Sequence, residues 1–400
     1  MSKPSLRFKD YQTEWQEKPL KNLVNKITTG SLDANAATNK GKYKFFTCSR
    51  VDYKTDTYEF DGDAIIVNGN GELGVTKTYS GKFNAYQRTY VLMDFLKEYQ
   101  FLGKAIPHYL PNKIKSEAIG GAMPYIKMNT LADLMVKYPN KEEEQKQISE
   151  FLSNVDSLLE EKKKELEKTK KFKQTMLSKM FPHGNSKVPE IRFNGFNDNW
   201  NEEIYGKIFE KINNNSYSRD LLNYKSGTSK SIHYGDILIK FGFTVDVNHK
   251  QVPFINQEVK ISTSDKVNIL KSGDVVFADT AEDTTAGKAI EIINNNNTPT
   301  FAGLHTFASR PLKYFENGFL GICFNTSQFH DQLIPFMQGT KVTGFNYDSL
   351  CKTLVRYPNN KEQKKIVEFF ETLNKNINNL ENEIVNLEHL KSTLLNKMFA

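Results

Sequence analysis

The sequence predicts an α+β protein in which two mixed α/β globular domains are separated by an antiparallel coiled coil of two long helices, with a pseudo-two-fold internal repeat. Three observations predict this fold. A short opening segment occurs twice, two long segments carry a heptad pattern, and the stretches between them read mostly as strands and turns. A chain of 400 residues is long enough for about two domains.

The sequence contains an internal repeat in which each half has a similar opening segment and a similar closing segment, which we call the frame, around a different middle. Pro4–Phe8 returns as Pro189–Phe193, and Trp15 returns as Trp200, 185 residues later. Near the end of each half, Leu177–Phe181 returns as Leu395–Phe399, now 218 residues later. The two middles, residues 28–137 and 213–356, show no convincing similarity. The pattern indicates one scaffold that presents two different recognition surfaces.

The closing segment of each half predicts a long helix. Both are rich in Glu, Lys, Leu and Gln, and neither contains Gly or Pro. With alternating spacings of four and three, nine of ten positions from Ile366 to Met398 are apolar, as are seven of ten from Ile148 to Met180. This heptad seam favours a coiled coil of roughly 55 Å over a surface helix with one buried stripe. Antiparallel packing would place Phe399 about as near Pro4 as Phe181 is to Pro189.

These segments divide the chain into four parts. We expect a first recognition domain over residues 1–142, a first long helix over 143–181, a second domain over 182–361 and a second long helix over 362–400. Within the middles, a Gly-Asp-apolar pattern predicts a turn and then a strand at three places, and Asn-rich or Asn-Gly sequences predict a loop and a hairpin turn. These segments are Gly62–Val67, Gly235–Ile239, Gly273–Phe277, the loop Asn294–Asn297 and the turn Asn317-Gly318.

Composition excludes several classes of protein. No run approaches the roughly 18 apolar residues of a membrane span, and the start lacks the apolar stretch of a secretory signal. Three distant cysteines indicate neither a disulfide framework nor a metal site, so a cytoplasmic protein is expected. The net charge is +7. Residues 1–140 hold 20 basic and 14 acidic side chains, whereas residues 181–360 hold 18 of each.

Motifs for catalysis are missing or out of context, so no catalytic residue is predicted. Gly69–Gly74 spells G-x-G-x-x-G, and Asp94 follows at a distance that suits a dinucleotide site. That site needs a helix after the glycines, but Val75–Gly81 reads as strand and turn. The chain has no phosphate-cradling P-loop, amino-methyltransferase motif or nuclease signature, and its seven histidines are scattered. An enzyme that uses the Gly69–Gly74 loop stays an alternative.

The whole layout resembles the specificity subunits of type I restriction–modification systems. The repeated Pro4–Phe8 and Pro189–Phe193 segments, the two tryptophans and both Glu-Gln-Lys helices that end in Lys-Met-Phe carry the resemblance. It implies that each middle is a target-recognition domain for one half of a split, asymmetric DNA sequence. It also implies that the helices set the gap between halves and dock two methyltransferase subunits. S-adenosylmethionine, ATP and magnesium would belong to those partners and to motor-nuclease (restriction) subunits, and none to this chain.

Base reading needs Arg, Lys, Asn, Gln or small polar groups on loops that enter a groove. The candidates for DNA binding are Arg50, Asn68, Asn70, Lys77, Tyr86 and Arg88 in the first domain, and Lys240, Thr280, Lys288, His305, Arg310 and Lys341 in the second. Candidates for partner docking are the apolar residues outside the seam: Phe151, Leu158, Phe172, Leu177, Phe369 and Leu395. Because the second domain is neutral, we expect weak DNA binding by this chain alone. A protein–protein scaffold with no DNA role is the other open reading.

Overall fold

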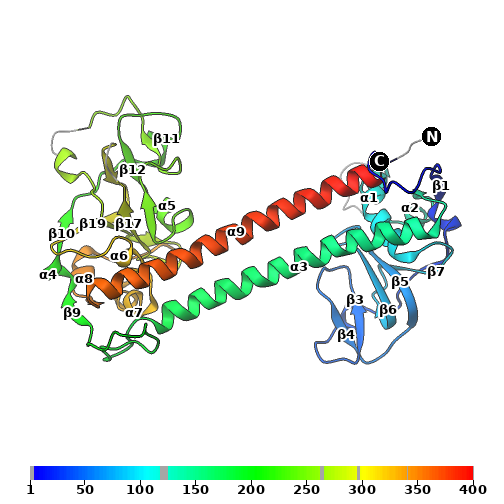
Figure 1. The fold of residues 1–400 in the computed structure, drawn as a ribbon, viewed down its shortest axis with the longest axis horizontal. Coiled ribbons are helices and arrows are strands. Elements are labelled where there is room, and N and C mark those ends of the chain that lie inside the picture. Colours follow the sequence, from blue (N-terminus) through cyan, green and yellow to red (C-terminus); the bar gives the residue numbers. More distant parts are fainter. Residues whose placement is uncertain (1–3, 118–124, 262–264, 295–297, 340, 400) are drawn as a thin grey trace. The chain divides into compact units, whose positions relative to one another are not determined.

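The computed structural model describes residues 4–117, 125–261, 265–294, 298–339 and 341–399. Its contacts divide the chain into two units: unit 1 comprises residues 1–164 and 380–400, and unit 2 comprises residues 165–379 (Figure 1). The boundary therefore runs through both long helices rather than at their ends. Each unit consists of one globular domain and half of each helix.

Unit 1 is built on a six-stranded sheet with the strand order β2-β7-β5-β6-β3-β4. The run Ala64–Val67 is completely buried, which explains why it forms the central strand β5. A two-stranded sheet of β1 and β8, two helices and two short 3-10 turns complete the domain. The elements are β1 Gln16–Pro19, η1 Leu20–Asn22, β2 Val24–Thr29, η2 Ala34–Ala36, β3 Tyr43–Phe46, β4 Tyr53–Thr55, β5 Phe60–Asn68, β6 Thr76–Ala85, β7 Thr89–Phe95, α1 Tyr99–Glu117, α2 Met128–Ala132 and β8 Met135–Tyr138.

Unit 2 is built on a five-stranded sheet with the strand order β10-β19-β15-β17-β13, and a four-stranded sheet β11-β14-β12-β18 stands beside it. Two further pairs, β9 with β21 and β16 with β20, are two-stranded. The strands are β9 Asn201–Ile204, β10 Phe209–Ile212, β11 Leu222–Asn223, β12 Lys230–Ile232, β13 Thr244–Asp246, β14 Phe254–Ile255, β15 Val275–Ala278, β16 Thr280–Ala281, β17 Ala289–Ile293, β18 Thr300–Ala302, β19 Thr306–Pro311, β20 Thr343–Gly344 and β21 Leu354–Tyr357. The helices are α4 Tyr205–Ile208, η3 Arg219–Leu221, α5 Tyr234–Ile239, η4 Asp265–Asn268, α6 Phe319–Phe324, α7 Ser327–His330, η5 Ile334–Phe336 and α8 Tyr347–Cys351.

The two main sheets have the same topology, which the sequence did not reveal. In unit 1, β2 pairs antiparallel with β7, β7 with β5 and β5 with β6, and β6 then pairs parallel with β3. In unit 2, the series β10, β19, β15, β17 and β13 repeats those four pairings with the same directions. The two middles therefore share the topology of five sheet strands, although their sequences show no convincing similarity.

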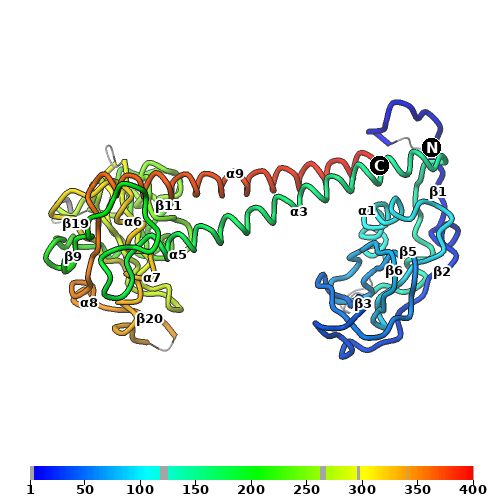
Figure 2. The backbone as a smooth tube through the Cα atoms, turned by 60° about the horizontal axis from the view of Figure 1, so that its bottom comes forward, coloured from blue at the N-terminus to red at the C-terminus, as the bar shows by residue number. Residues whose placement is uncertain are grey.

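The predicted frame is present in both units with equivalent contacts. The Leu6 amide donates to the Lys397 carbonyl at 3.0 Å, and the Ile191 amide donates to the Lys179 carbonyl at 2.9 Å. These bonds bring the end of each long helix to the opening segment, as predicted (Figure 2). The tryptophans occupy matching aromatic clusters, with Trp15 against Phe101 and Phe399, and Trp200 against Phe319 and Phe181.

The long helices are α3, Glu142–Lys179, and α9, Asn360–Phe399. In unit 1, ion pairs join Asp156 to Lys391 at 2.6 Å and Lys162 to Glu383 at 3.0 Å. The numbers rise along α3 while they fall along α9, so the helices are antiparallel. Seam residues that are buried include Ile148, Leu152, Leu159, Ile366, Phe370, Ile384 and Met398, which confirms the heptad pattern.

Three local predictions were wrong. Gly235–Ile239 lies in helix α5 instead of a strand, because the His233 side chain accepts the Gly235 amide proton and starts a helical turn. Asn317-Gly318 does not form a hairpin, since helix α6 follows it instead of a strand, and Gly318 with φ +92° is the N-cap of that helix. The strands predicted at Gly62–Val67 and Gly273–Phe277 are β5 and β15, but the turn predicted at the start of Gly62–Val67 is absent, because β5 already begins at Phe60. Residues 295–297 of the Asn-rich loop lie outside the described residues.

Candidate nucleic-acid interface

The first candidate surface lies in unit 1, where β5 ends and β7 begins. A cavity of about 520 Å³ is lined by Thr29, Gly69, Asn70, Gln87, Arg88, Tyr90, Tyr125, Ile126 and Lys127. The Gly69 amide donates to the Arg88 carbonyl at 3.0 Å, and the Ile126 amide donates to the Gly69 carbonyl at 2.9 Å. A side chain at Gly69 would meet that Arg88 carbonyl oxygen at 2.4 Å, so only glycine permits this close approach. Three loops are thereby held around one cavity.

The chemistry of this cavity suits base edges. Gln87, Arg88, Tyr125 and Lys127 are exposed, and the Lys127 ammonium lies 5.8 Å from the centre of the Tyr125 ring. Arg and Gln side chains can each form paired hydrogen bonds with a base, and an aromatic ring offers an apolar contact. The site thus combines hydrogen-bond donors, acceptors and a stacking face.

The remaining first-domain candidates have structural neighbours. Asn68 is 1% exposed, so its side chain belongs to the interior, where its amide nitrogen has no hydrogen-bond partner among the described residues. Lys77 donates to Asp52 at 2.6 Å and to the Arg50 carbonyl at 2.8 Å, so it holds the 49–52 loop. Burial raises the pKa of Asp52, but hydrogen bonds from Lys77 and Lys44 outweigh this and lower it. The Arg50 side chain is 76% exposed, and Tyr86 is half-buried.

The corresponding strand end in unit 2 brings His305 beside Asp279. Here β15 ends and β19 begins, and the His305 ring nitrogen Nδ1 lies 3.5 Å from the Asp279 carboxylate. The His305 side chain is 52% exposed, and its backbone has a φ of +55°. Burial raises the pKa of Asp279, whereas His305 opposes that shift. Thr280 is buried and donates to the Thr343 carbonyl at 3.1 Å.

A cluster of basic and aromatic side chains adjoins His305. Tyr234 packs its ring edge against His305, with ring centres 5.3 Å apart, and stacks obliquely on His233 at 4.6 Å. On helix α5, the buried Asp236 carboxylate binds Arg219 at 2.7 Å and Lys240 at 2.8 Å. We call Arg219, Tyr224, Asp236 and Lys240 the α5 cluster. One carboxylate faces two cations, so the cluster is positively charged.

The other second-domain candidates are used inside the domain or stand apart. Arg310 donates to both carboxylate oxygens of Asp274, at 2.9 and 2.7 Å, and Asp274 is 1% exposed. Lys288 donates to the carbonyls of Leu238 and Phe241 at 2.9 and 3.0 Å, and burial lowers its pKa. Lys341 is exposed. Arg310 and Lys288 therefore support the fold, and the candidates at the surface are Lys240, His305 and Lys341.

Sequence reasoning missed several residues of these two surfaces. Gln87, Tyr125 and Lys127 line the cavity in unit 1, and Arg219 and Tyr224 belong to the α5 cluster in unit 2. Gln87 stands between two chosen residues, so its position could have been found. Tyr125 comes from a segment after α1 that only the fold brings to the cavity.

The docking candidates on the long helices divide into two groups. Phe151, Leu158 and Phe172 are 38 to 46% exposed. Leu177 is 5% exposed in the core of unit 2, and Phe369 and Leu395 pack partly against the cores of their units. The first group therefore remains partly exposed at the surface of α3.

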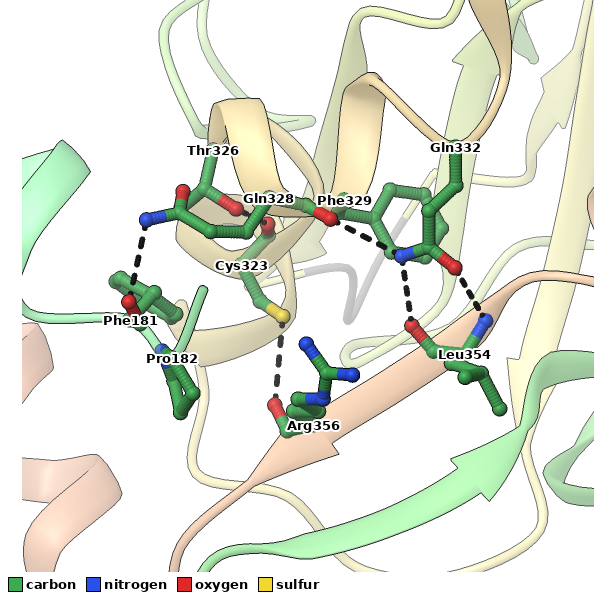
Figure 3. Close-up of a pocket in the computed structure, with 9 residues that line it drawn as sticks. All are labelled: Phe181, Pro182, Cys323, Thr326, Gln328, Phe329, Gln332, Leu354 and Arg356. Atoms are coloured by element: carbon green, nitrogen blue, oxygen red, sulfur yellow. Dashed lines mark hydrogen bonds between the residues drawn. The ribbon is translucent and has the colours of Figure 1, made fainter. Parts of the chain in front are cut away.

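A small cavity in unit 2, the Gly69–Gly74 loop and the potential metal ligands among the described residues indicate no further binding site. A cavity of about 20 Å³ beside Cys323, Gln328 and Arg356 has room for little more than one water molecule (Figure 3). The side-chain amides of Gln328 and Gln332 donate their hydrogen bonds to nearby backbone carbonyls. The Gly69–Gly74 loop leads into strand β6, so the geometry of a dinucleotide site is not formed. Within the described residues, no group of three or more His, Cys, Asp or Glu side chains could hold a metal ion, and no helix is long and apolar enough to span a membrane.

Comparisons with known proteins agree with this geometry. Residues 12–168 match the model of a family described as the type I restriction modification DNA specificity domain. The chain is 37% identical over 169 residues to the EcoDI specificity subunit of Escherichia coli, and 28% identical over 131 residues to the MjaVIII specificity subunit of Methanocaldococcus jannaschii. These alignments cover 41% and 32% of this chain, and 37% and 30% of the two relatives. The chain therefore matches well under half the length of either relative.

Solved structures show a similar fold over almost the whole chain. The type I S subunit from M. genitalium superimposes with a TM-score of 0.60 at 16% identity, over 100% of this chain and 99% of that one. A chain from a structure on complex assembly and conformational transition of the type I R-M system superimposes with a TM-score of 0.58 at 15% identity, over 97% and 98%. These findings confirm the resemblance to type I specificity subunits: the sequence likeness covers residues 12–168, and the likeness in fold covers the chain.

Proposed function

We propose that this protein is the DNA-recognition (specificity) subunit of a type I restriction–modification system, and that each unit reads one half of a split, asymmetric target. One observation carries the proposal. Both units have the same sheet topology, yet the same end of that sheet presents Gln87 and Arg88 in unit 1 and His305 with the α5 cluster in unit 2. One fold with two different polar surfaces is what two different half-sites require.

Direct reading of bases depends on where donors and acceptors lie. Each base pair shows a distinct pattern in the major groove, and Arg and Gln recognise guanine and adenine there through paired hydrogen bonds. Phosphate contacts fix the register of the protein but carry no sequence information. Residues 181–360 in unit 2 have balanced charge apart from local clusters, so partner subunits would supply much of the attraction to phosphates.

The proposed partners are double-stranded DNA, two adenine-methyltransferase subunits and restriction subunits. The exposed Phe151, Leu158 and Phe172 on α3 provide apolar contacts for the methyltransferases. In this proposal the chain itself catalyses nothing and binds no cofactor. S-adenosylmethionine, ATP and magnesium belong to the partner subunits.

The test is a map of adenine methylation in the source cell with and without this gene. Loss of one split motif from both strands supports the proposal and reveals both half-sites and the spacer. A chimaera that exchanges residues 28–137 for those of another such subunit changes only one half-site. An unchanged map in cells that express the methyltransferase subunits contradicts the proposal.

A protein–protein scaffold with no DNA role is the second candidate, and one cavity favours it. About 560 Å³ of space in unit 1 is lined by more acidic than basic side chains, with Asp61, Asp63, Asp94, Glu98 and Glu142 against Lys97 and Lys146. Acidic walls repel DNA and attract basic protein segments. Purified complexes separate the two candidates, because only the DNA-recognition subunit yields sequence-specific retention of a DNA duplex.

A further inference from the structure

The α5 cluster in unit 2 holds an arginine in a single orientation. Arg219 Nη1 donates to the Asp236 carboxylate at 2.7 Å and to the Tyr224 hydroxyl at 3.2 Å, and Nη2 lies 3.3 Å from His233 Nδ1. The Gly235 amide also donates to His233 Nδ1 at 3.2 Å, which makes that nitrogen an acceptor. Three hydrogen bonds therefore fix a side chain that remains 44% exposed.

The buried carboxylate of Asp236 holds the Arg219 side chain in place. Asp236 is fully buried, and a buried charge is strongly unfavourable unless it is paired and hydrogen-bonded. Lys240 supplies the second cation at 2.8 Å, and its ammonium lies 4.5 Å from the centre of the Tyr224 ring. Because Asp236 neutralises only one of the two cations, the exposed edge of the cluster stays positive.

Arg219 has N–H donors that the fold leaves unused. A guanidinium has five N–H groups, and the three bonds above engage both Nη1 protons and one Nη2 proton. In the described part of the chain, the Nε–H and the second Nη2–H have no hydrogen-bond acceptor. These donors remain for an acceptor outside the chain, and arginine can pair two N–H groups with the O6 and N7 acceptors of guanine.

We infer that Arg219, preset by Asp236, reads a guanine in the half-site of unit 2, an inference that rests on the proposed function. Lys240 beside it is a flexible point charge, which suits an adjacent phosphate better than a base. The Tyr234 ring contacts both His305 and His233, and His233 Nδ1 lies 3.3 Å from Arg219 Nη2, so a chain of contacts connects His305 to the cluster. Asp236 is a positioning residue, since it is buried and acts on DNA only through Arg219 and Lys240.

The experiment maps adenine methylation in cells that carry the methyltransferase subunits with wild-type or Arg219→Lys protein. Lysine keeps the charge but has no paired donors. We expect a G·C pair at one position of the second half-site, and a loss of discrimination there of about 5- to 150-fold in the variant, from the usual contribution of a paired Arg–guanine contact. Asp236→Asn is expected to relax the same position, while Lys225→Ala, an exposed neighbour, leaves the motif unchanged.

The first half-site serves as the internal control for folding and assembly. If it is still read while the second half-site of Arg219→Lys stays unchanged, or if that half-site has no G·C pair, the inference is wrong and the proposed function stands. A uniform loss of methylation at all sites, with a salt dependence reduced by about one phosphate contact, assigns Arg219 to the backbone and also overturns the inference. A wild-type map without a split motif removes the proposed function itself.

Discussion

Arg7 forms a bidentate hydrogen bond with Glu144: Nε and Nη2 donate to the two carboxylate oxygens at 2.7 and 2.9 Å. Glu144 is fully buried in the first turn of α3, and Arg7 belongs to the opening segment of the chain. Arg192 and Glu362 repeat the pair in unit 2, with both distances at 2.7 Å. This pair attaches the start of each half to the helix that closes it.

Removing this arginine should destabilise each unit strongly. Arg7→Ala or Arg192→Ala leaves a buried carboxylate without its cation, which typically costs about 3–5 kcal/mol of unfolding free energy. Urea unfolding followed by circular dichroism measures the loss. The control is Lys21→Ala, which removes an exposed ion pair with Asp133 and should change little. Equal effects of Arg7→Ala and Lys21→Ala would contradict the structural role.

Arg310 should act on stability rather than on the DNA motif. Its bidentate contact with the buried Asp274 makes it part of the interior support of β15 and β19. Arg310→Ala should therefore lower the unfolding free energy of unit 2 by about 3–5 kcal/mol, since Asp274 then stays buried and unpaired. In cells at reduced temperature, where the variant is folded, the methylation motif should match that of the wild type. A changed base in the second half-site would reassign Arg310 to readout.

Glu291 should make unit 2 less stable as the pH rises. Burial raises its pKa to about 7, although the amides of Gly321 and Gly318 donate to it and oppose the shift. The folded state therefore binds a proton more tightly than the unfolded state, where the pKa is near its usual value. Stability is highest below the unfolded pKa and falls by up to about 3 kcal/mol as the pH rises through 7.

Glu291→Gln isolates this contribution, because glutamine does not ionise. Burial also raises the pKa of Asp274 and Asp279, so the wild type and the variant must be compared at each pH. We expect the variant to lose less unfolding free energy than the wild type between pH 5 and pH 8 in urea titrations. Parallel curves for the two proteins would exclude Glu291 as the titrating group.

Arg88 and Gln87 should determine part of the first half-site. Both are exposed at the cavity in unit 1 and can form paired hydrogen bonds with bases. Arg88→Ala or Gln87→Ala should each relax one position of the first half-site, with a loss of discrimination of about 1–3 kcal/mol. The methylation map measures this, and Lys40→Ala, which is exposed elsewhere in unit 1, is the matched control. A change in the second half-site would contradict the assignment.

Features that depend on neighbours along the chain could be predicted from the sequence, whereas features that depend on distant segments could not. Heptad spacing, Gly-Asp-apolar patterns and repeated segments are local signals, and they located α3, α9, β5 and β15. Which loop residues share a surface depends on chain segments far apart in sequence. Tyr125 reaches Gly69 through the bond from Ile126, and Asn68 turned inward beside the same cavity, so neither position was evident from its neighbours along the chain.

The sequence by itself determined the frame: two halves, each opened by the same short segment and closed by the same kind of helix, because those signals repeat in order along the chain. Only the tertiary structure decided that the two unlike middles share one sheet topology, and that Gly235-Asp236 begins a helix while Gly273-Asp274 begins a strand. The physical reason is that a buried carboxylate needs a cation as its partner, and residues elsewhere in the sequence provide that cation. Asp236 pairs with Arg219 and Lys240, and Asp274 pairs with Arg310. The same Gly-Asp dipeptide therefore occurs in two different local structures.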